Sequence, residues 1–400
     1  MTYSEIKDSG VPWIGEIPAH WEITRSKIVF QNVTIKNHPD AMVLSLYRDL
    51  GVLPKESRDD NHNVTSEDTA QYKFVEPGNL VINKMKAWQG SLAVSAYSGI
   101  VSPAYYVCKF RSNAVDKRYV HYLLRSSVYA QEFERLSTGM RVGQWDLGID
   151  DFLKIPILLP ETDEQKSIAD FLDAQCGEID AIIGEAKASI EEYKRWKASV
   201  IYQAVAKGLD PNAPMKDSGV LWIGKVPAHW EVSKAKYHVA ITNGSDPNTE
   251  GDIPVYGSGA GSFKTCGEYK EGPAVLIGRK GATLHIPHFI EGRYWNADTA
   301  FDVKAKQGYS LRYFYYSACC FDYKYYISQT TLPSMTQSNY TNMKVPVPPM
   351  QEQYNIVGFL DAQCTEIDSV ISEKQALISE LEAYKKSLIY EAVTGKRKVG

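Results

Sequence analysis

Apolar side chains recur every three or four residues along two long segments of the chain, at 168–204 and 356–392. A spacing near 3.5 residues, held over many turns, is typical of helices that pack in a coiled coil. One additional four-residue step, between Ile179 and Ile183, is a stutter that locally unwinds such a coil. Prolines precede both segments and glycines follow them, as expected at helix boundaries. The pattern predicts two helices of about 45 residues, each roughly 65 Å long.

These two helices are expected to pack on each other within the chain. An apolar stripe of that length is unstable in water, and a duplicated unit that closes on itself has pseudo-twofold symmetry, which makes the helices antiparallel. The alternative is two separate amphipathic helices, each packed on its own domain. The residues expected at the helix–helix contact are Ile168, Leu172, Ile179, Ile183, Ile190, Val200, Ile356, Leu360, Ile367, Ile371, Ile378, Leu381 and Leu388.

Outside the long helices, shorter apolar runs are punctuated by Pro, Gly and Asn, as in mixed α/β domains. The expected strands are 79–85, 99–110, 274–278 and 299–305, and the expected shorter helices are 119–136 and 310–326. The fold class is therefore two α/β (α+β) domains joined to an intramolecular antiparallel coiled coil.

Two blocks of sequence occur twice. KDSGVPWIGEIPAHWE at 7–22 returns as KDSGVLWIGKVPAHWE at 216–231. FLDAQCGEID at 171–180 returns as FLDAQCTEID at 359–368. The order is A–B–A′–B′, an internal repeat, whereas the sequences between the matched blocks share little. Two shared frames therefore carry two different inserts.

The repeat divides the chain into a first domain, a central helix, a second domain and a C-terminal helix, at 1–155, 156–210, 211–347 and 348–400. The central helix carries 6 basic and 11 acidic residues, whereas the second domain carries 14 and 11. Because the net charge of the whole chain is −4, the chain as a whole is not an evident nucleic-acid binder. The domains, not the helices, are the parts expected to meet an anionic polymer.

The cysteines and the N-terminal sequence bear on the compartment. None of the six cysteines forms a C-x-x-C pair, so they are expected to be reduced structural thiols and not zinc ligands. The first residues have no apolar signal core, and no stretch approaches the roughly 20 apolar residues of a membrane helix. A cytoplasmic protein without a bound metal is the expectation.

Short matches to catalytic motifs do not form complete sites. Residues 219–225 read G-x-x-x-x-G-K, but Val226 stands where a phosphate-binding loop needs Ser or Thr. The HWE of each first block spells H-x-E, without the P-C-x-x-C of zinc deaminases. No motif of a base methyltransferase is present. The sequence predicts a chain without a catalytic centre.

With these repeats in order, the chain resembles the specificity (S) subunit of Type I restriction–modification enzymes. The resemblance is carried by W-I-G-x-[IV]-P-A-H-W-E, P-x-x-x-E-Q-x-x-I-x-x-F-L-D and S-[VL]-I-Y-x-A-V, each present twice. It covers essentially the whole chain. It implies that each insert is a target recognition domain that reads one half of a bipartite, asymmetric DNA site, and that the coiled coil sets the spacer between the halves.

The resemblance also implies partners. Two modification subunits, which methylate adenine and hold S-adenosylmethionine, would dock on the coiled coil. Restriction subunits would join for translocation that consumes ATP and Mg²⁺. No cofactor is then expected on this chain itself, which would be a non-catalytic subunit of the complex.

Candidate DNA contacts are polar and basic side chains in loops outside the expected helices. Such side chains supply the donors that base edges and phosphates accept. A solvated loop position is the alternative for each of them. The candidates are Lys84, Lys86, Gln89, Arg141 and Gln144 in the first insert, and Arg279, Lys280, Thr283, His285, Thr336 and Gln337 in the second.

Rival interpretations make different predictions. A stand-alone sequence-specific DNA-binding protein would bind its site without a methyltransferase partner. A nuclease would use Asp252, Glu268 and Lys270, which spell a D…E-x-K pattern short enough to arise by chance. A coiled-coil scaffold would show no dependence of DNA specificity on the inserts. Two unlike inserts in matched frames favour sequence recognition.

Overall fold

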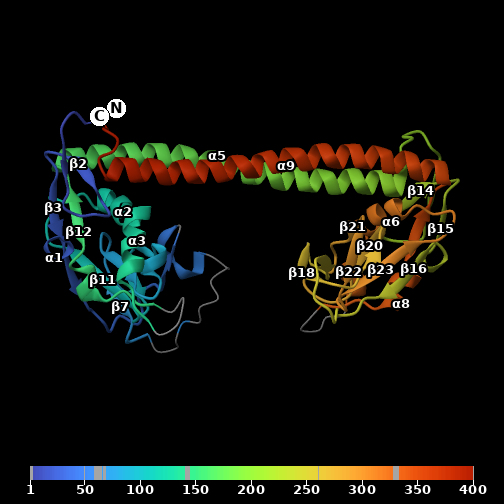
Figure 1. The fold of residues 1–400 in the computed structure, drawn as a ribbon, viewed down its shortest axis with the longest axis horizontal. Helices are drawn as coiled ribbons and strands as arrows, with labels where there is room; N and C mark the ends of the chain where they lie inside the picture. The colour runs from blue at the N-terminus through green and yellow to red at the C-terminus, as the bar shows by residue number, and fades with distance from the viewer. Residues whose placement is uncertain are drawn as a thin grey trace. The chain divides into compact units, whose positions relative to one another are not determined.

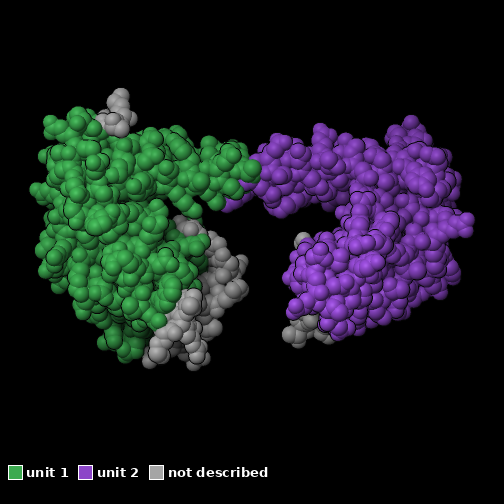
Figure 2. Space-filling view, viewed as in Figure 1, with its two compact units in different colours: residues 1–185, 376–400 green, residues 186–375 purple. Residues whose placement is uncertain are grey.

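The computed structural model describes residues 3–48, 50–57, 65, 69–139, 145–259, 261–327 and 333–399. The chain divides into two compact units (Figure 2): unit 1 contains residues 1–185 and 376–400, and unit 2 contains residues 186–375. Each unit therefore combines one mixed α/β domain with a part of each long helix.

Unit 1 is built on an antiparallel four-stranded sheet in the order β4-β11-β8-β9, with four two-stranded ladders, β1–β2, β3–β12, β5–β6 and β7–β10 (Figure 1). The strands are β1 (Ile6–Asp8), β2 (Glu16–Pro18), β3 (Glu22–Arg25), β4 (Phe30–Val33), β5 (Leu44–Tyr47), β6 (Gly51–Pro54), β7 (Lys73–Val75), β8 (Leu80–Asn83), β9 (Leu92–Val94), β10 (Gly99–Val101), β11 (Tyr105–Phe110) and β12 (Pro156–Leu159). The short helices are α1 (Ser26–Val29), η1 (Lys55–Ser57), η2 (Ala87–Gln89), α2 (Lys117–Arg125), α3 (Ser127–Leu136) and α4 (Ile149–Phe152).

Unit 2 repeats this plan, with the sheet order β16-β23-β20-β21 and the ladders β13–β14 and β15–β24. It adds a second sheet in the order β18-β17-β22-β19. The strands are β13 (Met215–Asp217), β14 (Lys225–Pro227), β15 (Glu231–Lys234), β16 (Val239–Asn243), β17 (Ile253–Tyr256), β18 (Ser262–Cys266), β19 (Lys270–Glu271), β20 (Ala274–Gly278), β21 (His288–Ile290), β22 (Arg293–Asn296), β23 (Ala300–Ala305) and β24 (Lys344–Val347). The short helices are η3 (Ala235–Tyr237), α6 (Leu311–Ala318), α7 (Tyr323–Tyr326) and α8 (Gln337–Asn342).

Two long helices complete the architecture: α5 (Thr162–Lys207, 46 residues) and α9 (Met350–Val393, 44 residues). They contact each other inside each unit. In unit 1 the Lys385 ammonium lies 2.6 Å from the Asp180 carboxylate. In unit 2 Lys197 pairs with Asp368 at 2.6 Å, and Lys374 lies over the Tyr193 ring. Since the partner's number rises from 368 to 374 as the α5 number falls, the two helices run antiparallel within unit 2.

The core of each unit contains side chains from both long helices. In unit 1, Leu172 of α5 and Leu388 of α9 are buried in one cluster with the domain. In unit 2, Val205 of α5 and Leu360 of α9 are buried in the corresponding cluster. The alternative in which each helix packs only on its own domain is therefore wrong, because each domain is completed by a helix from the other half of the sequence.

The residues expected at the helix–helix contact are buried to different degrees. The buried ones are Ile168, Leu172, Ile179, Ile183, Ile190, Ile356, Leu360, Ile367 and Leu388. The partly buried ones are Val200, Ile371, Ile378 and Leu381. Among the described helices, none combines the length and apolar character needed to cross a membrane.

Three of the shorter elements differ from the sequence-based expectation. The helix expected at 119–136 is split at Ser126, whose backbone is extended (φ −65°, ψ 154°) and whose hydroxyl donates to the Leu123 carbonyl. The helix expected at 310–326 ends at Ala318 and resumes at Tyr323. The strand expected at 99–110 is two strands, β10 and β11, which join different partners. Local apolar spacing is continuous across these breaks, so it does not reveal them.

His121 of α2 is held neutral inside unit 1. Its Nδ1 accepts the Val94 N–H at 3.3 Å, and burial, helped by the nearby Arg125 charge, lowers its pKa to about 3. An unfolded histidine titrates near 6.5, so below that pH the unfolded state binds a proton that the folded state does not bind. We therefore expect this residue to lower the free energy of unfolding by about 2 kcal/mol between pH 7 and pH 5.

Denaturant titrations at the two pH values check this expectation. His121→Gln should remove that part of the pH dependence, whereas the same change at the exposed His285 should leave it in place. Equal pH dependence in wild type and His121→Gln would contradict a neutral, partly buried imidazole.

Candidate nucleic-acid interface

In unit 1, two loops that are distant in sequence meet at one end of the sheet. The Leu147 N–H donates to the Lys84 carbonyl at 2.9 Å, and the Lys84 ammonium pairs with Asp146 at 2.9 Å. The Trp88 and Trp145 rings pack edge to face, with centroids 5.4 Å apart. We call residues 84–91 with 145–147 tip 1.

The predicted residues of tip 1 have different surroundings. Lys86 and Gln89 are exposed on η2 and its N-terminal side. Lys84 is partly buried, and its hydrogen bond to Asp146 raises its pKa. Arg141 and Gln144 lie outside the described residues. Tip 1 therefore presents cationic and amide donors beside a fixed pair of indole rings.

In unit 2, the corresponding strand end is joined to a distant segment in the same way. The Met335 N–H donates to the Arg279 carbonyl at 2.9 Å, and the Gly281 N–H donates to the Pro333 carbonyl at 3.0 Å. Lys280 lies 3.2 Å from the Asp298 carboxylate. Lys84 and Arg279 therefore hold equivalent places, each directly after the third strand of its sheet order. We call residues 279–285 with 333–337 tip 2.

Some predicted residues of tip 2 already have intramolecular roles. The Thr336 hydroxyl caps α8 by accepting the Asn339 N–H at 3.1 Å, and the Gln337 amide donates to the Ile241 carbonyl. Thr283 is partly buried and His285 is exposed, with its ring 6.4 Å from that of Tyr323. Thr336 and Gln337 position the segment, and their side chains are less free to read bases than those of Lys280 and His285.

Further cations, which were not predicted from the sequence, lie near tip 1. Lys73 of β7 donates to the Tyr105 carbonyl at 2.5 Å, and burial together with the Lys36 and Lys84 charges lowers its pKa. Lys36 in turn donates to Gln71 at 2.8 Å. Lys73 sits in a short strand without an apolar pattern of its own, so only the fold brings it beside Lys84. Three lysines therefore lie near one another at this end of the sheet, and such positive charge is what a phosphate-binding surface uses.

In both units, the domain that bears the tip is attached to the long helices by the same set of contacts. In unit 1, the Arg118 guanidinium and the Tyr122 hydroxyl both reach the Asp173 carboxylate, at 2.7 and 2.8 Å. In unit 2, Arg312 and Tyr316 reach Asp361 at 2.9 and 2.5 Å. The R-Y-x-x-Y pattern, shared by residues 118–122 and 312–316, could have predicted from the sequence that both domains make these contacts.

A buried glutamine repeats the correspondence. Gln165 accepts the Asp116 N–H and donates to the Pro160 carbonyl, both at 2.8 Å. Gln353 accepts the Ser310 N–H at 2.8 Å and donates to the Pro348 carbonyl at 2.9 Å. Each amide therefore joins the first turn of a long helix to the start of α2 or α6.

The duplicated HWE motif is used for the same attachment. His20 lies 2.8 Å from Glu164 and His229 lies 2.7 Å from Glu352, in hydrogen bonds between ring nitrogen and carboxylate. The Trp230 indole also donates to Glu352 at 2.8 Å. The motif ties the leading block of each repeat to the first turn of a long helix, which is a structural use of H-x-E.

Two of the three nuclease-like residues, Glu268 and Lys270, are engaged within the fold. Glu268 accepts hydrogen bonds from the Thr249 hydroxyl and from backbone N–H groups, which lowers its pKa to about 2. Lys270 is held by Asn296 at 2.7 Å and Asp302 at 3.2 Å. Within the described ranges, no group of three or more His, Cys, Asp or Glu side chains is placed to hold a metal ion. The arrangement does not favour metal-dependent hydrolysis.

Comparison with known proteins gives consistent matches along the chain. A family model described as Type I restriction modification DNA specificity domain matches residues 32–192 and 231–382. A Methanocaldococcus jannaschii protein named "Putative type I restriction enzyme MjaX specificity subunit" is 23% identical over 427 residues, covering 96% of each chain. From the same organism, "Type I restriction enzyme MjaVIII specificity subunit" is 29% identical over 180 residues, covering 43% of this chain and 40% of that protein.

Solved structures share the fold at low sequence identity. A chain from a structure described as "Structural basis underlying complex assembly and conformational transition of the type I R-M system" has a TM-score of 0.71 at 14% identity, covering 94% of this chain and 98% of that chain. The HsdS subunit from Thermoanaerobacter tengcongensis has a TM-score of 0.50 at 14% identity, covering 95% and 98%. At this identity the likeness is one of fold.

Proposed function

Because the chain belongs to the family of Type I restriction modification DNA specificity domains, with two matched regions, we propose that it recognises DNA as the specificity subunit of such a complex. Unit 1 reads one half of a bipartite target and unit 2 reads the other. The stand-alone DNA-binding protein and the partnerless scaffold are the less favoured alternatives.

One observation carries this proposal. The two units share a sheet order and the same attachments to the long helices, yet their tips carry different side chains. Bases are distinguished by their pattern of hydrogen-bond donors and acceptors. Two domains that recognise different sequences therefore need different donors at equivalent places on a common fold. Unlike tips predict a non-palindromic target.

The roles of the helices and partners extend the proposal. An antiparallel coiled coil of α5 and α9 would set the spacer between the half-sites and dock two adenine methyltransferase subunits, with restriction subunits joining in the cytoplasm. Those partners would hold S-adenosylmethionine, ATP and Mg²⁺, and this chain would contribute no catalytic group.

Methylome sequencing of cells that express the chain with its neighbouring methyltransferase tests the proposal. We expect methylated adenines in a bipartite motif. A deletion between Ile179 and Ile190 should change the spacer or abolish methylation. Methylation of the same motif in the absence of this chain would overturn the proposal.

Variants of the two tips should affect DNA binding differently. Arg279→Ala is expected to weaken binding of the assembled complex to its target about 10–100-fold and to relax specificity at one half-site. Lys86→Gln should weaken binding to all sequences and reduce the slope of log affinity against log salt by about one. Fluorescence anisotropy over a salt series measures both, with Lys194→Gln on α5 as the control. Equal effects of all three changes would contradict the assignment of the tips.

A further inference from the structure

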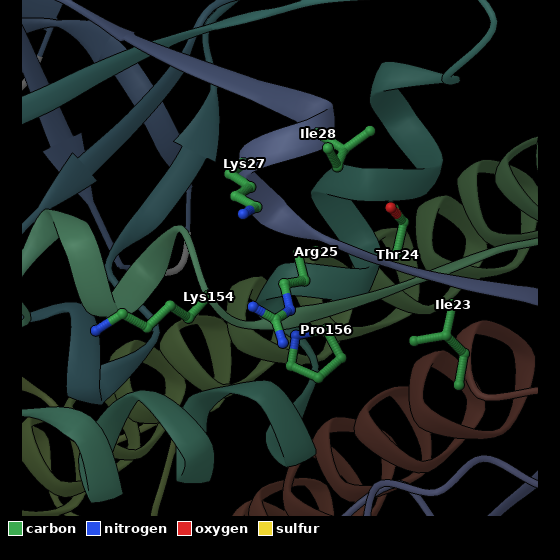
Figure 3. Close-up of a pocket in the computed structure, with 7 residues that line it drawn as sticks. All are labelled: Ile23, Thr24, Arg25, Lys27, Ile28, Lys154 and Pro156. Carbon is green, nitrogen blue, oxygen red and sulfur yellow. The ribbon is translucent and has the colours of Figure 1, made fainter.

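A cationic depression lies in unit 1 away from tip 1 (Figure 3). Its volume is about 550 Å³, and Arg25, Lys27 and Lys154 line it together with Ile28. No carboxylate lines it. Lys154 reaches Asp151 at 3.0 Å, one turn earlier in the chain. Ile28 is 60% exposed and lies at the edge of this group of cations (Figure 3). We call Arg25, Lys27, Ile28 and Lys154 basic patch 1.

Unit 2 carries a corresponding surface at the same place in the fold. Lys234, Lys236 and Tyr237 stand where unit 1 has Arg25, Lys27 and Ile28, and Tyr237 is 62% exposed. The third cation, Lys344, pairs across the β15–β24 ladder with Lys234. We call these four residues basic patch 2.

The backbone that carries the two patches is anchored identically. The Ser26 N–H donates to the Ile155 carbonyl at 2.8 Å, and the Ala235 N–H donates to the Met343 carbonyl at 2.8 Å. The surfaces therefore correspond at Arg25, Lys27 and Ile28, whereas the third cation is placed differently, because Lys344 faces Lys234 where Pro156 faces Arg25. A surface that is present in both units is expected to bind a partner that is common to both units. It is not expected to read a base sequence that differs between the two half-sites.

The patches lie at the end of the sheet opposite the tips. In unit 1, Phe30 at the start of β4 pairs with Phe110, whereas Asn83, next to tip 1, pairs with Tyr105 at the other end of β11. Five residue steps of β11 separate these ends, roughly 16 Å at about 3.3 Å per residue. The patch is therefore a full strand length away from the tip that is proposed to read bases.

The chemistry of the patches fits a protein. An exposed apolar side chain beside a group of cations is typical of a protein interface, in which apolar anchors lie next to polar side chains. A phosphate backbone would use the cations but gain nothing from an exposed isoleucine. We propose that each basic patch contacts an acidic surface of the methyltransferase subunit that docks on the adjoining part of the coiled coil, one copy on each unit. This inference rests on the proposed function.

Charge reversal in one unit at a time tests the inference. Arg25→Glu with Lys27→Glu should remove one methyltransferase copy, and Lys236→Glu with Lys344→Glu should remove the other. Native mass spectrometry of the full chain with its methyltransferase counts the copies. We expect the affected copy to bind about 100-fold more weakly, because like charges meet across the interface.

Controls separate the possible outcomes. Lys36→Glu with Lys86→Glu makes the same charge change near tip 1 and should leave both copies bound. The charge-neutral changes Ile28→Ser and Tyr237→Ser should each weaken one copy, and unchanged thermal unfolding should show that the fold is intact. Full stoichiometry in the patch variants, with weaker DNA binding and a smaller salt slope, would overturn the inference in favour of phosphate contacts. If the wild-type chain binds no methyltransferase at all, the proposed function fails together with it.

Discussion

Gln353→Met is expected to lower the free energy of unfolding of unit 2 by about 2–6 kcal/mol, because it leaves two buried backbone groups without a hydrogen-bond partner, at a cost of about 1–3 kcal/mol each. The Gln353 side chain is fully buried, accepting the Ser310 N–H and donating to the Pro348 carbonyl. Methionine preserves the volume but offers neither bond. Denaturant unfolding measures the loss, and faster hydrogen exchange of the Ser310 amide locates it.

Gln351 provides the matched control for this change. It lies in the same helical turn, is exposed, and its amide donates to the Asn355 side chain at 3.1 Å. Gln351→Met should change stability by less than about 0.5 kcal/mol. Gln165→Met should reproduce the large effect in unit 1. Similar losses for Gln351 and Gln353 would contradict the role given to the buried amide.

A half chain of residues 1–208 is expected to form a dimer with a dissociation constant below about 1 µM. In the full chain, the end of α9 fills the core of unit 1, and the Val393 carbonyl accepts from Tyr119. The end of α5 does the same in unit 2, where the Val205 carbonyl accepts from Tyr313. Since the two helix ends are nearly identical in sequence, each copy of the half chain can complete the core of the other.

Light scattering with size-exclusion chromatography measures the mass of this species. Residues 1–198, which lack the helix end, should not dimerise. In the dimer, Lys197 of one copy would meet Asp180 of the other, so Lys197→Asp should weaken it and the added Asp180→Lys should restore it. A monomeric, stably folded half chain would contradict the exchange of helix ends.

The long helices and the repeat could be predicted from sequence because their signals are local or duplicated. The apolar period over 168–204 predicts a helix because helical hydrogen bonds join residues four apart. The glycine at 208 predicts its end, and α5 ends at Lys207. The recurrence of FLDAQC and HWE showed directly that the two halves of the sequence share one framework. Lys84 and Arg279 were predicted as DNA contacts from loop position and charge; they occupy equivalent places in the two sheets, and their contact with DNA stays a prediction.

Other features depend on contacts between residues far apart in the chain. The break at Ser126, the approach of Lys73 to Lys84 and the capping role of Thr336 follow from packing that no local pattern encodes. Arg25 and Lys154 form one surface only because β12 returns beside β3.

By itself, the sequence determined the two helices, the duplicated frame and the family to which the chain belongs. Only the tertiary structure decided which helix end completes which domain, and which polar side chains remain free to meet a partner. The physical reason is that helix formation follows from neighbouring residues, whereas burial and hydrogen-bond satisfaction follow from segments that meet only in the folded chain.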